Sequence, residues 1–476
     1  MKNSLNNDTL KREIGYFSAT TLVVANMVGT GIFTTSGFVI QELGSPLAML
    51  LCWAAGGVFA LCGALCYGEL GARFPKAGGE YVFLRESFGP SMGFLSGWIS
   101  LIVGFSAPIA AAAIAFSIYL FQALGIPPGK PAVFSIGNVQ LFHMSPHVLV
   151  AMAMVIAISL LHFHSLRIGS RVQNVLTVFK VMLIVLFVGA GLLLGTGSTE
   201  HFTIPMEPVG GLAERFAVSL IFISFAYSGW NAAAYLGGEI KRPGRTIPFA
   251  LFFGALFVTI LYLLLNAVYI YALTPGQMGG AVDVGARAAI SLFGPGISRA
   301  ISAAVALGLL SVLSAMILTG PRVYYAMSKD GLFFGLFGKV SQTRHTPAHS
   351  IFLQAAIAIA MVATASYDKL LLYIGFTLSL VALLTVAGMI RLRLTQPLVG
   401  AGYRTFGYPI TPLLFIIGNI WIIYFSVSRR PVPALAGLVT IAVGMGIYFL
   451  FETRRRKTRS GLSDVDSVSE TIITKS

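Results

Sequence analysis

Two short segments rich in glycine and small polar residues interrupt apolar stretches that are otherwise long enough to cross a membrane. The first is Gly29-Thr30-Gly31, and the second is segment 225–231, which reads FAYSGWN. A peptide group left without a partner in hydrocarbon costs several kcal/mol, so a break at this depth must line a cavity or contact a ligand. We therefore expect the two breaks to form a ligand site.

The two breaks would expose backbone groups of opposite polarity. A helix that restarts after Gly29–Gly31 presents free N–H groups and a positive dipole end, which suit a carboxylate. A helix that ends near Phe225–Tyr227 presents free carbonyls, which suit a cation. A zwitterion such as an α-amino acid matches both. For Gly29 and Gly31 alone, close helix packing through small residues is the alternative, and the second break makes it the weaker explanation.

Lys180 lies deep in another apolar stretch. It follows Arg171 by nine residues, which places it about 13 Å along a helix that rises 1.5 Å per residue. The side chain would be strained to bring its amine to the membrane surface from there. An ionisable group inside a membrane is by default a functional candidate. Two roles for Lys180 stay open: it is either a fixed charge that holds neighbouring helices together or a group that gains and loses a proton.

The composition predicts the elements that must position these residues. The chain is 56% hydrophobic and 10% charged, whereas soluble domains are about 25% charged. Apolar stretches of about 20 residues, the length that spans a bilayer, recur along the whole chain. We predict an all-α integral membrane protein whose twelve spans lie near 17–40, 45–71, 90–124, 146–165, 171–195, 213–236, 246–273, 298–327, 348–366, 369–390, 410–427 and 432–451.

The basic residues predict the orientation. Most of the 32 Lys and Arg residues fall in the loops on the same side as the N-terminus. The positive-inside rule then predicts a multi-pass protein of the plasma membrane with both termini cytoplasmic. The net charge of +15 is therefore explained by loops that face anionic lipid, and no nucleic acid partner is expected.

The spans divide into two halves of five. An odd number of spans gives the halves opposite orientations, so they would form an inverted repeat, and each half begins with its broken span. Paired breaks in corresponding spans are typical of the binding site of a secondary transporter. The predicted parts are a cytoplasmic segment 1–16, repeats 17–195 and 213–390, helices 11 and 12 at 410–451, and a tail 452–476 that is basic and then disordered.

The residues required for several other kinds of site are absent from the sequence. The three cysteines, Cys52, Cys62 and Cys66, all fall in the second predicted span, so no disulfide-linked ancillary subunit is expected. No metal-ligand spacing such as H-E-x-x-H and no phosphate-binding loop is found, so we expect neither an enzyme nor a metal or cofactor.

Acidic residues bear on the substrate. Glu69 and Glu239 fall at cytoplasmic ends of spans and Glu42 towards the outside, so no acid is expected beside either break. A cationic side chain would then lack a counter-charge, which favours neutral amino acids. Arginine and lysine stay open, because aromatic rings and carbonyls can also hold a cation.

Four segments resemble signatures of the amino acid–polyamine–organocation transporters, in particular their L-type branch, which includes bacterial serine/threonine exchangers. These segments are 22–37 (LVVANMVGTGIFTTSG), 68–84 (GELGARFPKAGGEYVFL), 224–248 (SFAYSGWNAAAYLGGEIKRPGRTIP) and 320–331 (GPRVYYAMSKDG). The resemblance covers roughly residues 12–450. It implies a LeuT-type fold of twelve helices, with two repeats of five helices followed by two more.

The resemblance also implies roles for residues at the breaks. Gly29, Thr30 and Gly31 match a Gly-Ser-Gly motif whose amides hold the substrate carboxylate. Phe225 matches an aromatic gate over the substrate, and Asn231 matches a polar residue of the pocket. Carbonyls for the substrate ammonium would come from Met27, Val28, Phe225, Ala226 and Ser228. Relatives often have glycine at position 228, so Ser228 would shorten the pocket.

Lys180 matches a family lysine that fills the space of a sodium ion in LeuT-type relatives. Its amine would face carbonyls of the first span and Ser314 of the eighth. The resemblance thus implies a sodium-independent secondary transporter of neutral L-amino acids that works by alternating access, as an exchanger. The alternatives are proton-coupled symport, transport of cationic amino acids or polyamines, and a nutrient receptor that binds without transporting.

Overall fold

The fold is described from a computed structural model of the chain. The described residues are 12–127, 132–136, 139–164, 166–204, 211–281, 283–341, 346–364, 367–396, 402–429, 431–450 and 452. The predictions for the first eleven residues and for the tail beyond 452 lie outside this part of the chain.

The first half contains the helices that run to residue 194. They are α1 (Tyr16–Met27), α2 (Gly31–Leu43), α3 (Pro46–Arg73), α4 (Glu80–Phe88), α5 (Pro90–Ile99), the π-helical segment η1 (Ser100–Ser106), α6 (Ala107–Leu124), α7 (Pro146–His164) and α8 (Leu166–Leu194). A two-stranded antiparallel hairpin, β1 (Ala132–Ile136) with β2 (Val139–Met144), connects α6 to α7.

The second half begins with the short 3-10 turn η2 (Thr199–Phe202). Its further elements are α9 (Leu212–Tyr227), α10 (Ala232–Tyr235), α11 (Pro243–Ala272), α12 (Pro275–Met278), α13 (Val284–Phe293), η3 (Pro295–Ile297), α14 (Ser298–Thr319), α15 (Pro321–Lys329), η4 (Gly335–Gly338), α16 (Ala348–Thr364), α17 (Tyr367–Thr395) and α18 (Ile410–Arg429). The final helical stretch is Pro431–Leu450.

The nearly all-helical membrane architecture is confirmed. Nine helices in the described part of the chain are long and apolar enough to cross a membrane, and the bent pair α1–α2 makes a tenth candidate. The other two predicted spans correspond to shorter helices, α9 with α10 and α16. The total of twelve spans therefore stays a prediction.

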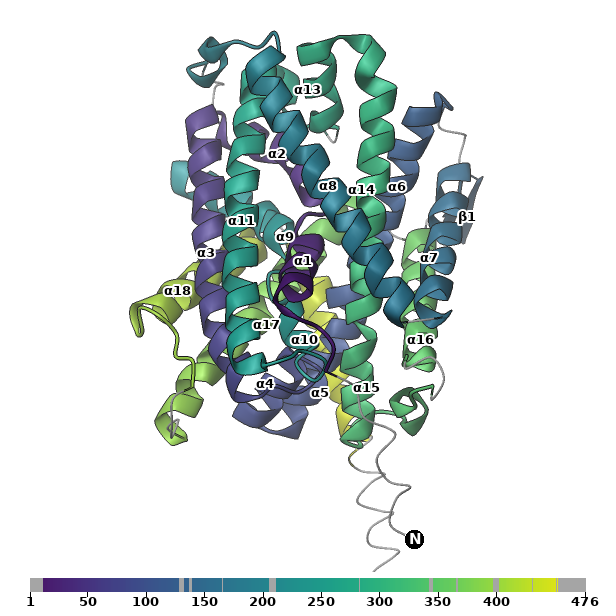
Figure 1. Cartoon of the computed structure of the whole chain (residues 1–476), viewed down its shortest axis with the longest axis vertical. Helices are drawn as coiled ribbons and strands as arrows, with labels where there is room; N and C mark the ends of the chain where they lie inside the picture. Colours follow the sequence, from purple (N-terminus) through teal and green to yellow (C-terminus); the bar gives the residue numbers. More distant parts are fainter. Residues whose placement is uncertain are drawn as a thin grey trace, which may run out of the picture.

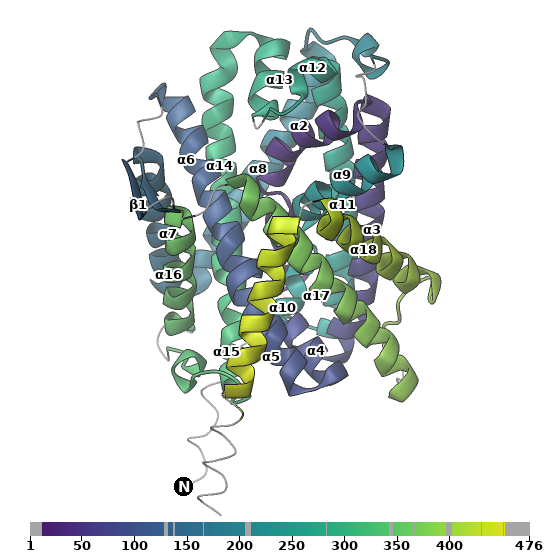
Figure 2. The ribbon, with the colours of Figure 1, turned by 180° about the vertical axis from the view of Figure 1, so that it is seen from behind.

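Helices of the first half pack against their counterparts in the second. α3 packs on α11, α6 on α14 and α7 on α16, and the broken pairs meet where α2 packs on α9 and α1 on α10. Figure 1 shows α3 beside α11, and Figure 2, from behind, shows Pro431–Leu450 and α18 lying outside this bundle against α17. The inverted relation of the two repeats stays a prediction.

Both predicted breaks are present and they touch each other. α1 ends at Met27 and α2 restarts at Gly31, with a bend of 42° between them. α9 ends at Tyr227, and four residues separate it from α10. A Cβ on Gly31 would lie 2.6 Å from the Ala226 Cα, and Gly229, at φ 93°, would place one 2.8 Å from the Asn26 backbone. Only glycine allows this approach and this conformation.

A π-helical segment interrupts the third predicted span beside the larger cavity described below. η1 ends two residues before Pro108, which has no N–H to donate to the preceding turn. Such π-helical turns are frequent at functional sites. Gly104 and Phe105 of η1 both line this cavity.

Backbone and ion-pair contacts close the lower end of the molecule in Figure 1. The carbonyl of Glu239 accepts hydrogen bonds from the N–H groups of Glu13 and Ile14, and the Lys241 N–H donates to the Ile14 carbonyl. The Glu239 carboxylate pairs with Arg322 of α15 at 2.9 Å, and both side chains are buried. The segment before α1 is thus bound to the loop after α10.

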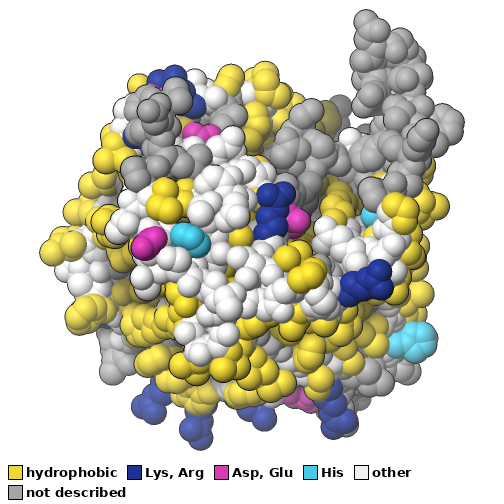
Figure 3. Space-filling view, turned by 90° about the horizontal axis from the view of Figure 1, so that it is seen from above, with side chains coloured by type: hydrophobic (Ala, Val, Ile, Leu, Met, Phe, Trp, Pro, Cys, Tyr) yellow, Lys and Arg dark blue, Asp and Glu magenta, His cyan; other side chains and the backbone are white. Residues whose placement is uncertain are grey.

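At the opposite end, the connection between α11 and α14 covers α2. The Gly280 N–H donates to the Gly37 carbonyl at 3.0 Å, and α12 and α13 both pack on α2. Figure 3 looks onto this end, where charged side chains of both signs are scattered among uncharged ones over the part drawn in colour. Both ends of the route to the breaks are therefore covered.

The Gly31–Ala226 contact predicts the effect of a single added methyl group. We expect Gly31→Ala to destabilise the protein by about 1–3 kcal/mol, because it overpacks backbone that cannot move aside. Gly189→Ala is the matched control, because nothing lies within 4 Å of the added Cβ. Thermal unfolding of the purified protein measures the effect; equal stability of the two variants would show that the breaks need no close contact.

Candidate binding site

The first break carries backbone donors with no backbone acceptor. Among the described residues, the N–H groups of Gly29 and Thr30 donate to no carbonyl, and Gly31 opens α2, where the first N–H groups have no partner within the helix. Thr30 is buried, and its side chain makes no capping bond to α2. The Gly29 N–H has the Tyr262 hydroxyl as a partner, so in the predicted carboxylate-binding motif, Gly29, Thr30 and Gly31, the free donors at this positive helix end are those of Thr30 and Gly31.

A tyrosine bridges the carbonyls of the two breaks. The Tyr262 hydroxyl of α11 lies 2.6 Å from the Met27 carbonyl oxygen and 3.1 Å from that of Ala226. The Phe225 carbonyl accepts from the Ser228 N–H at 3.0 Å. These three of the predicted ammonium-binding carbonyls thus already have a partner, and a ligand would use their second lone pairs or displace these bonds. Tyr262 gave no signal in the sequence, since it lies singly in an apolar run.

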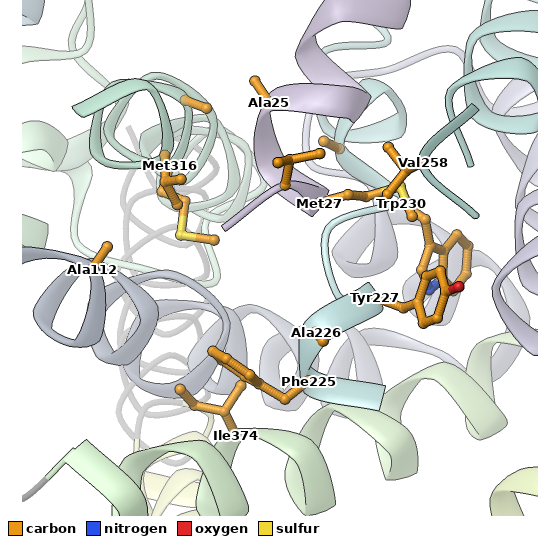
Figure 4. Close-up of a cluster of buried hydrophobic side chains, with 14 of the residues drawn as sticks. Ala25, Met27, Ala112, Phe225, Ala226, Tyr227, Trp230, Val258, Met316 and Ile374 are labelled. Carbon is orange, nitrogen blue, oxygen red and sulfur yellow. The ribbon is translucent and has the colours of Figure 1, made fainter. Parts of the chain in front are cut away.

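A small cavity lies where the two breaks meet. Its lining includes Gly29, Thr30, Gly31, Phe225 and Ser228, and its volume is about 20 Å³. This holds one or two water molecules, so the site must widen to admit an amino acid. In Figure 4, the side chains of Phe225, Met316 and Ala112 converge on the space beside Met27.

Phe225 separates this small cavity from a larger neighbour. The larger cavity, of about 100 Å³, is lined by Phe225, Ser228 and Asn231 together with Gly104 of η1 and Ser379 of α17. Phe225 and Ser228 line both cavities. Phe225 thus borders both cavities, and its role as a gate stays a prediction.

Lys180 is fully buried and binds the first break from α8. Its ammonium donates to the Ala25 carbonyl at 3.1 Å and also to the Val28 carbonyl. The side-chain stem packs on α14, where a Cβ on Gly308 would lie 3.3 Å from the Lys180 Cγ. The expected contact with the carbonyls of the first span is thus present, and it engages the Val28 carbonyl that was assigned to the substrate.

The expected contact between Lys180 and Ser314 is not found among the described residues. The Ser314 hydroxyl lies 2.8 Å from Nε2 of His162, a buried histidine at the end of α7. Histidine therefore satisfies Ser314, which corrects this part of the sequence interpretation. The proposal that Lys180 and Ser314 together replace a sodium ion stays a prediction, since the two side chains have different partners.

The sequence analysis missed an acid beside the second break. Glu80, the first residue of α4, lines the larger cavity and is 4% exposed. Its carboxylate accepts from Asn231 Nδ2 at 3.0 Å, from the Tyr67 hydroxyl at 2.5 Å and from the Tyr235 hydroxyl at 2.9 Å. The expectation that no acid reaches the breaks was wrong, because α4 folds back under α10 from what reads as a cytoplasmic loop.

Removing the Tyr262 hydroxyl tests whether it holds the two breaks together. We expect Tyr262→Phe to lose about 1–3 kcal/mol of stability, because two buried carbonyls lose the one O–H donor that they share. Tyr271→Phe, on the same helix, is the control, because its hydroxyl makes only a 3.4 Å bond to Gly195. Thermal unfolding midpoints of the two purified variants give the comparison. If Tyr262→Phe is no less stable than Tyr271→Phe, the bridge does not stabilise the breaks.

The geometry agrees with the comparisons to known proteins. The family model described as amino acid permease matches residues 14–450. The b(0,+)-type amino acid transporter 1 of Mus musculus is 29% identical over 452 residues, which cover 94% of this chain and 89% of the relative. The large neutral amino acids transporter small subunit 2 of Rattus norvegicus is 30% identical over 453 residues, covering 93% and 81%. These relatives confirm the resemblance to the L-type branch. The chain belongs to the amino acid permease family, whose members are transporters and not enzymes.

Proposed function

We propose that this permease exchanges neutral L-amino acids across the plasma membrane by alternating access, without sodium. The observation that carries the proposal is the meeting of the free N–H groups of Thr30 and Gly31 with the carbonyls of the second break. One pole binds a carboxylate and the other an ammonium group, so the zwitterion is fixed by backbone that every α-amino acid can use.

The remaining site residues divide between the backbone and side-chain parts of the substrate. Carbonyls for the ammonium come from Met27, Val28, Phe225, Ala226 and Ser228. Phe225 gates the passage to the larger cavity, and Asn231 is a polar residue in the wall of that cavity. Neutral side chains are supported by a relative named for large neutral amino acids.

Sodium independence rests on Lys180. Its ammonium places a fixed positive charge against carbonyls at the end of α1, where a bound cation would otherwise be needed to satisfy them. A covalently attached charge needs no ion gradient. The two covered ends of the bundle fit alternating access, because each must open in turn to release a substrate.

Further properties follow from the sequence. Both termini are proposed to be cytoplasmic, so the Glu239–Arg322 pair lies at the inner end and the α12–α13 cover at the outer end. The repeats are 17–195 and 213–390. We propose that the chain works without a disulfide-linked subunit, because its three cysteines are buried within α3.

Uptake into proteoliposomes tests the transport mode. Vesicles containing the full chain receive a radiolabelled mixture of neutral L-amino acids without sodium, either empty or preloaded with unlabelled amino acids. We expect saturable uptake only into preloaded vesicles, unchanged by added sodium. Uptake into empty vesicles would replace exchange with net transport, a requirement for sodium would contradict the role of Lys180, and binding without flux would indicate a receptor.

A substitution of Lys180 tests the same role directly. We expect Lys180→Met to reduce exchange more than tenfold, because the carbonyls of Ala25 and Val28 lose a buried charged donor. Lys339→Met removes an exposed lysine and serves as the control. Exchange is measured in preloaded vesicles with matched protein content. Full activity of Lys180→Met without sodium would exclude Lys180 as the substitute for the ion.

A further inference from the structure

Glu80 is a buried carboxylate surrounded by neutral donors. Tyr67 of α3 and Asn231 donate to its Oε1, and Tyr235 of α10 donates to its Oε2. Tyr67 has Thr385 of α17 within hydrogen-bonding reach. Around the carboxylate, therefore, every described polar contact is uncharged.

The charged groups on the surrounding elements are engaged elsewhere. The described ion pairs and ring contact near α4 are Arg393 with Glu69, Arg322 with Glu239, Arg85 with Asp330 and Glu86, Lys76 with Glu86, and Arg391 over the ring of Phe88. Burial without a positive partner raises the pKa of the Glu80 carboxyl, although its three hydrogen bonds oppose the shift. Among the described residues, the Glu80 carboxylate in this cavity wall thus has no positively charged partner.

A proton fits this place better than a cationic side chain. Three donors already occupy the carboxylate, so a guanidinium or ammonium group would have to displace at least one tyrosine hydroxyl. A proton needs a single lone pair, and the hydroxyl of Tyr67 or Tyr235 can reverse to accept it, because a hydroxyl both donates and accepts. Apart from the added proton, the ionised and protonated forms of Glu80 then differ only in the direction of one tyrosine hydrogen bond.

We propose that Glu80 is a proton-binding site in the wall of the substrate cavity, and that it takes up a proton when a neutral amino acid binds. Asn231 provides the link. A substrate that engages the Asn231 amide withdraws one of the three donors from the Glu80 carboxylate, which destabilises the charged form. One O–H bond forms on Glu80, no other bond breaks, and the proton comes from water.

Reciprocity fixes the sign of the effect. If substrate binding favours the protonated carboxyl, then protonation must favour substrate binding by the same factor. Apparent affinity for a neutral amino acid should therefore strengthen as the pH falls. The proposal uses the proposed substrate class only for this coupling, since the proton site itself exists without a substrate.

The first experiment needs no amino acid. Infrared difference spectra of the reconstituted full chain, recorded between acid and alkaline pH, should show the carbonyl band of a protonated buried carboxyl group. We expect Glu80→Gln to remove this band. Glu86→Gln, on the same helix and already paired with Arg85, should keep it. Persistence of the wild-type band in Glu80→Gln, or its absence from the wild type, overturns the proposal.

Two further variants keep the test valid if Glu80→Gln does not fold. Glu80→Asp should keep a titrating band. Tyr235→Phe removes one donor from the ionised carboxylate, so its band should titrate at higher pH than in the wild type. A midpoint that is unchanged or moves to lower pH in Tyr235→Phe contradicts the assignment to Glu80.

The second experiment measures coupling. Addition of the neutral amino acid mixture to weakly buffered proteoliposomes with a pH indicator should release hydroxide equivalents, that is, take up protons. The apparent affinity should strengthen by about fivefold or more between pH 8 and pH 6. Glu80→Gln should abolish both effects and Glu86→Gln neither.

The outcomes separate the two proposals. If no amino acid binds at any pH while the infrared band titrates with Glu80, the proton site stands and the proposed substrate class fails. If neutral amino acids exchange at a rate that no pH change or Glu80 substitution alters, exchange stands and the coupling fails. Loss of lysine uptake alone in Glu80→Gln would make Glu80 a subsite for cationic side chains and overturn the proton site.

Discussion

Every peptide group at membrane depth needs a hydrogen-bond partner. The arrangement of this permease follows from how the peptide groups at its two helix breaks find such partners. The Tyr262 hydroxyl lies within hydrogen-bonding distance of carbonyls of both breaks, and Lys180 donates to carbonyls at the end of α1. The N–H groups at Gly29 and Thr30 have no backbone acceptor among the described residues, and that of Gly29 reaches the Tyr262 hydroxyl. Most of the carbonyl acceptors thus have a partner within the protein, whereas the N–H groups of Thr30 and Gly31 are left for a ligand. This imbalance makes the site a better receptor for an anion than for a cation before substrate arrives.

The breaks themselves could be read from the sequence, because glycine and small polar residues are rare in apolar spans and have a direct physical meaning there. The depth of Lys180 was equally readable from its distance along a helix. These features depend on local composition and on helix geometry, which a single sequence contains. The family resemblance then gave the residues at the breaks their roles.

The parts that could not be predicted depend on which helices meet. Tyr262 looks like any other residue of an apolar helix until α11 is placed beside the breaks. Ser314 was assigned to Lys180, but His162 reaches it from α7. Glu80 lies in a segment with the polarity of a cytoplasmic loop, and only the return of α4 beneath α10 brings it to Asn231. Hydrogen-bond partners of this kind are determined by tertiary packing, and hydropathy and residue spacing contain no information about it.

The attachment of the segment before α1 has a consequence for sequence variation. Glu13 and Ile14 bind the loop after α10 through main-chain N–H and carbonyl groups only. Such bonds do not depend on side-chain identity, so position 13 can vary widely while the attachment is kept, whereas the Ile14 side chain also packs against the core. Proline is the exception, because at either position it would delete a donor to the Glu239 carbonyl. The attachment therefore depends mainly on the length and course of the backbone before α1. Sequence alignments that score residue identity would not detect it.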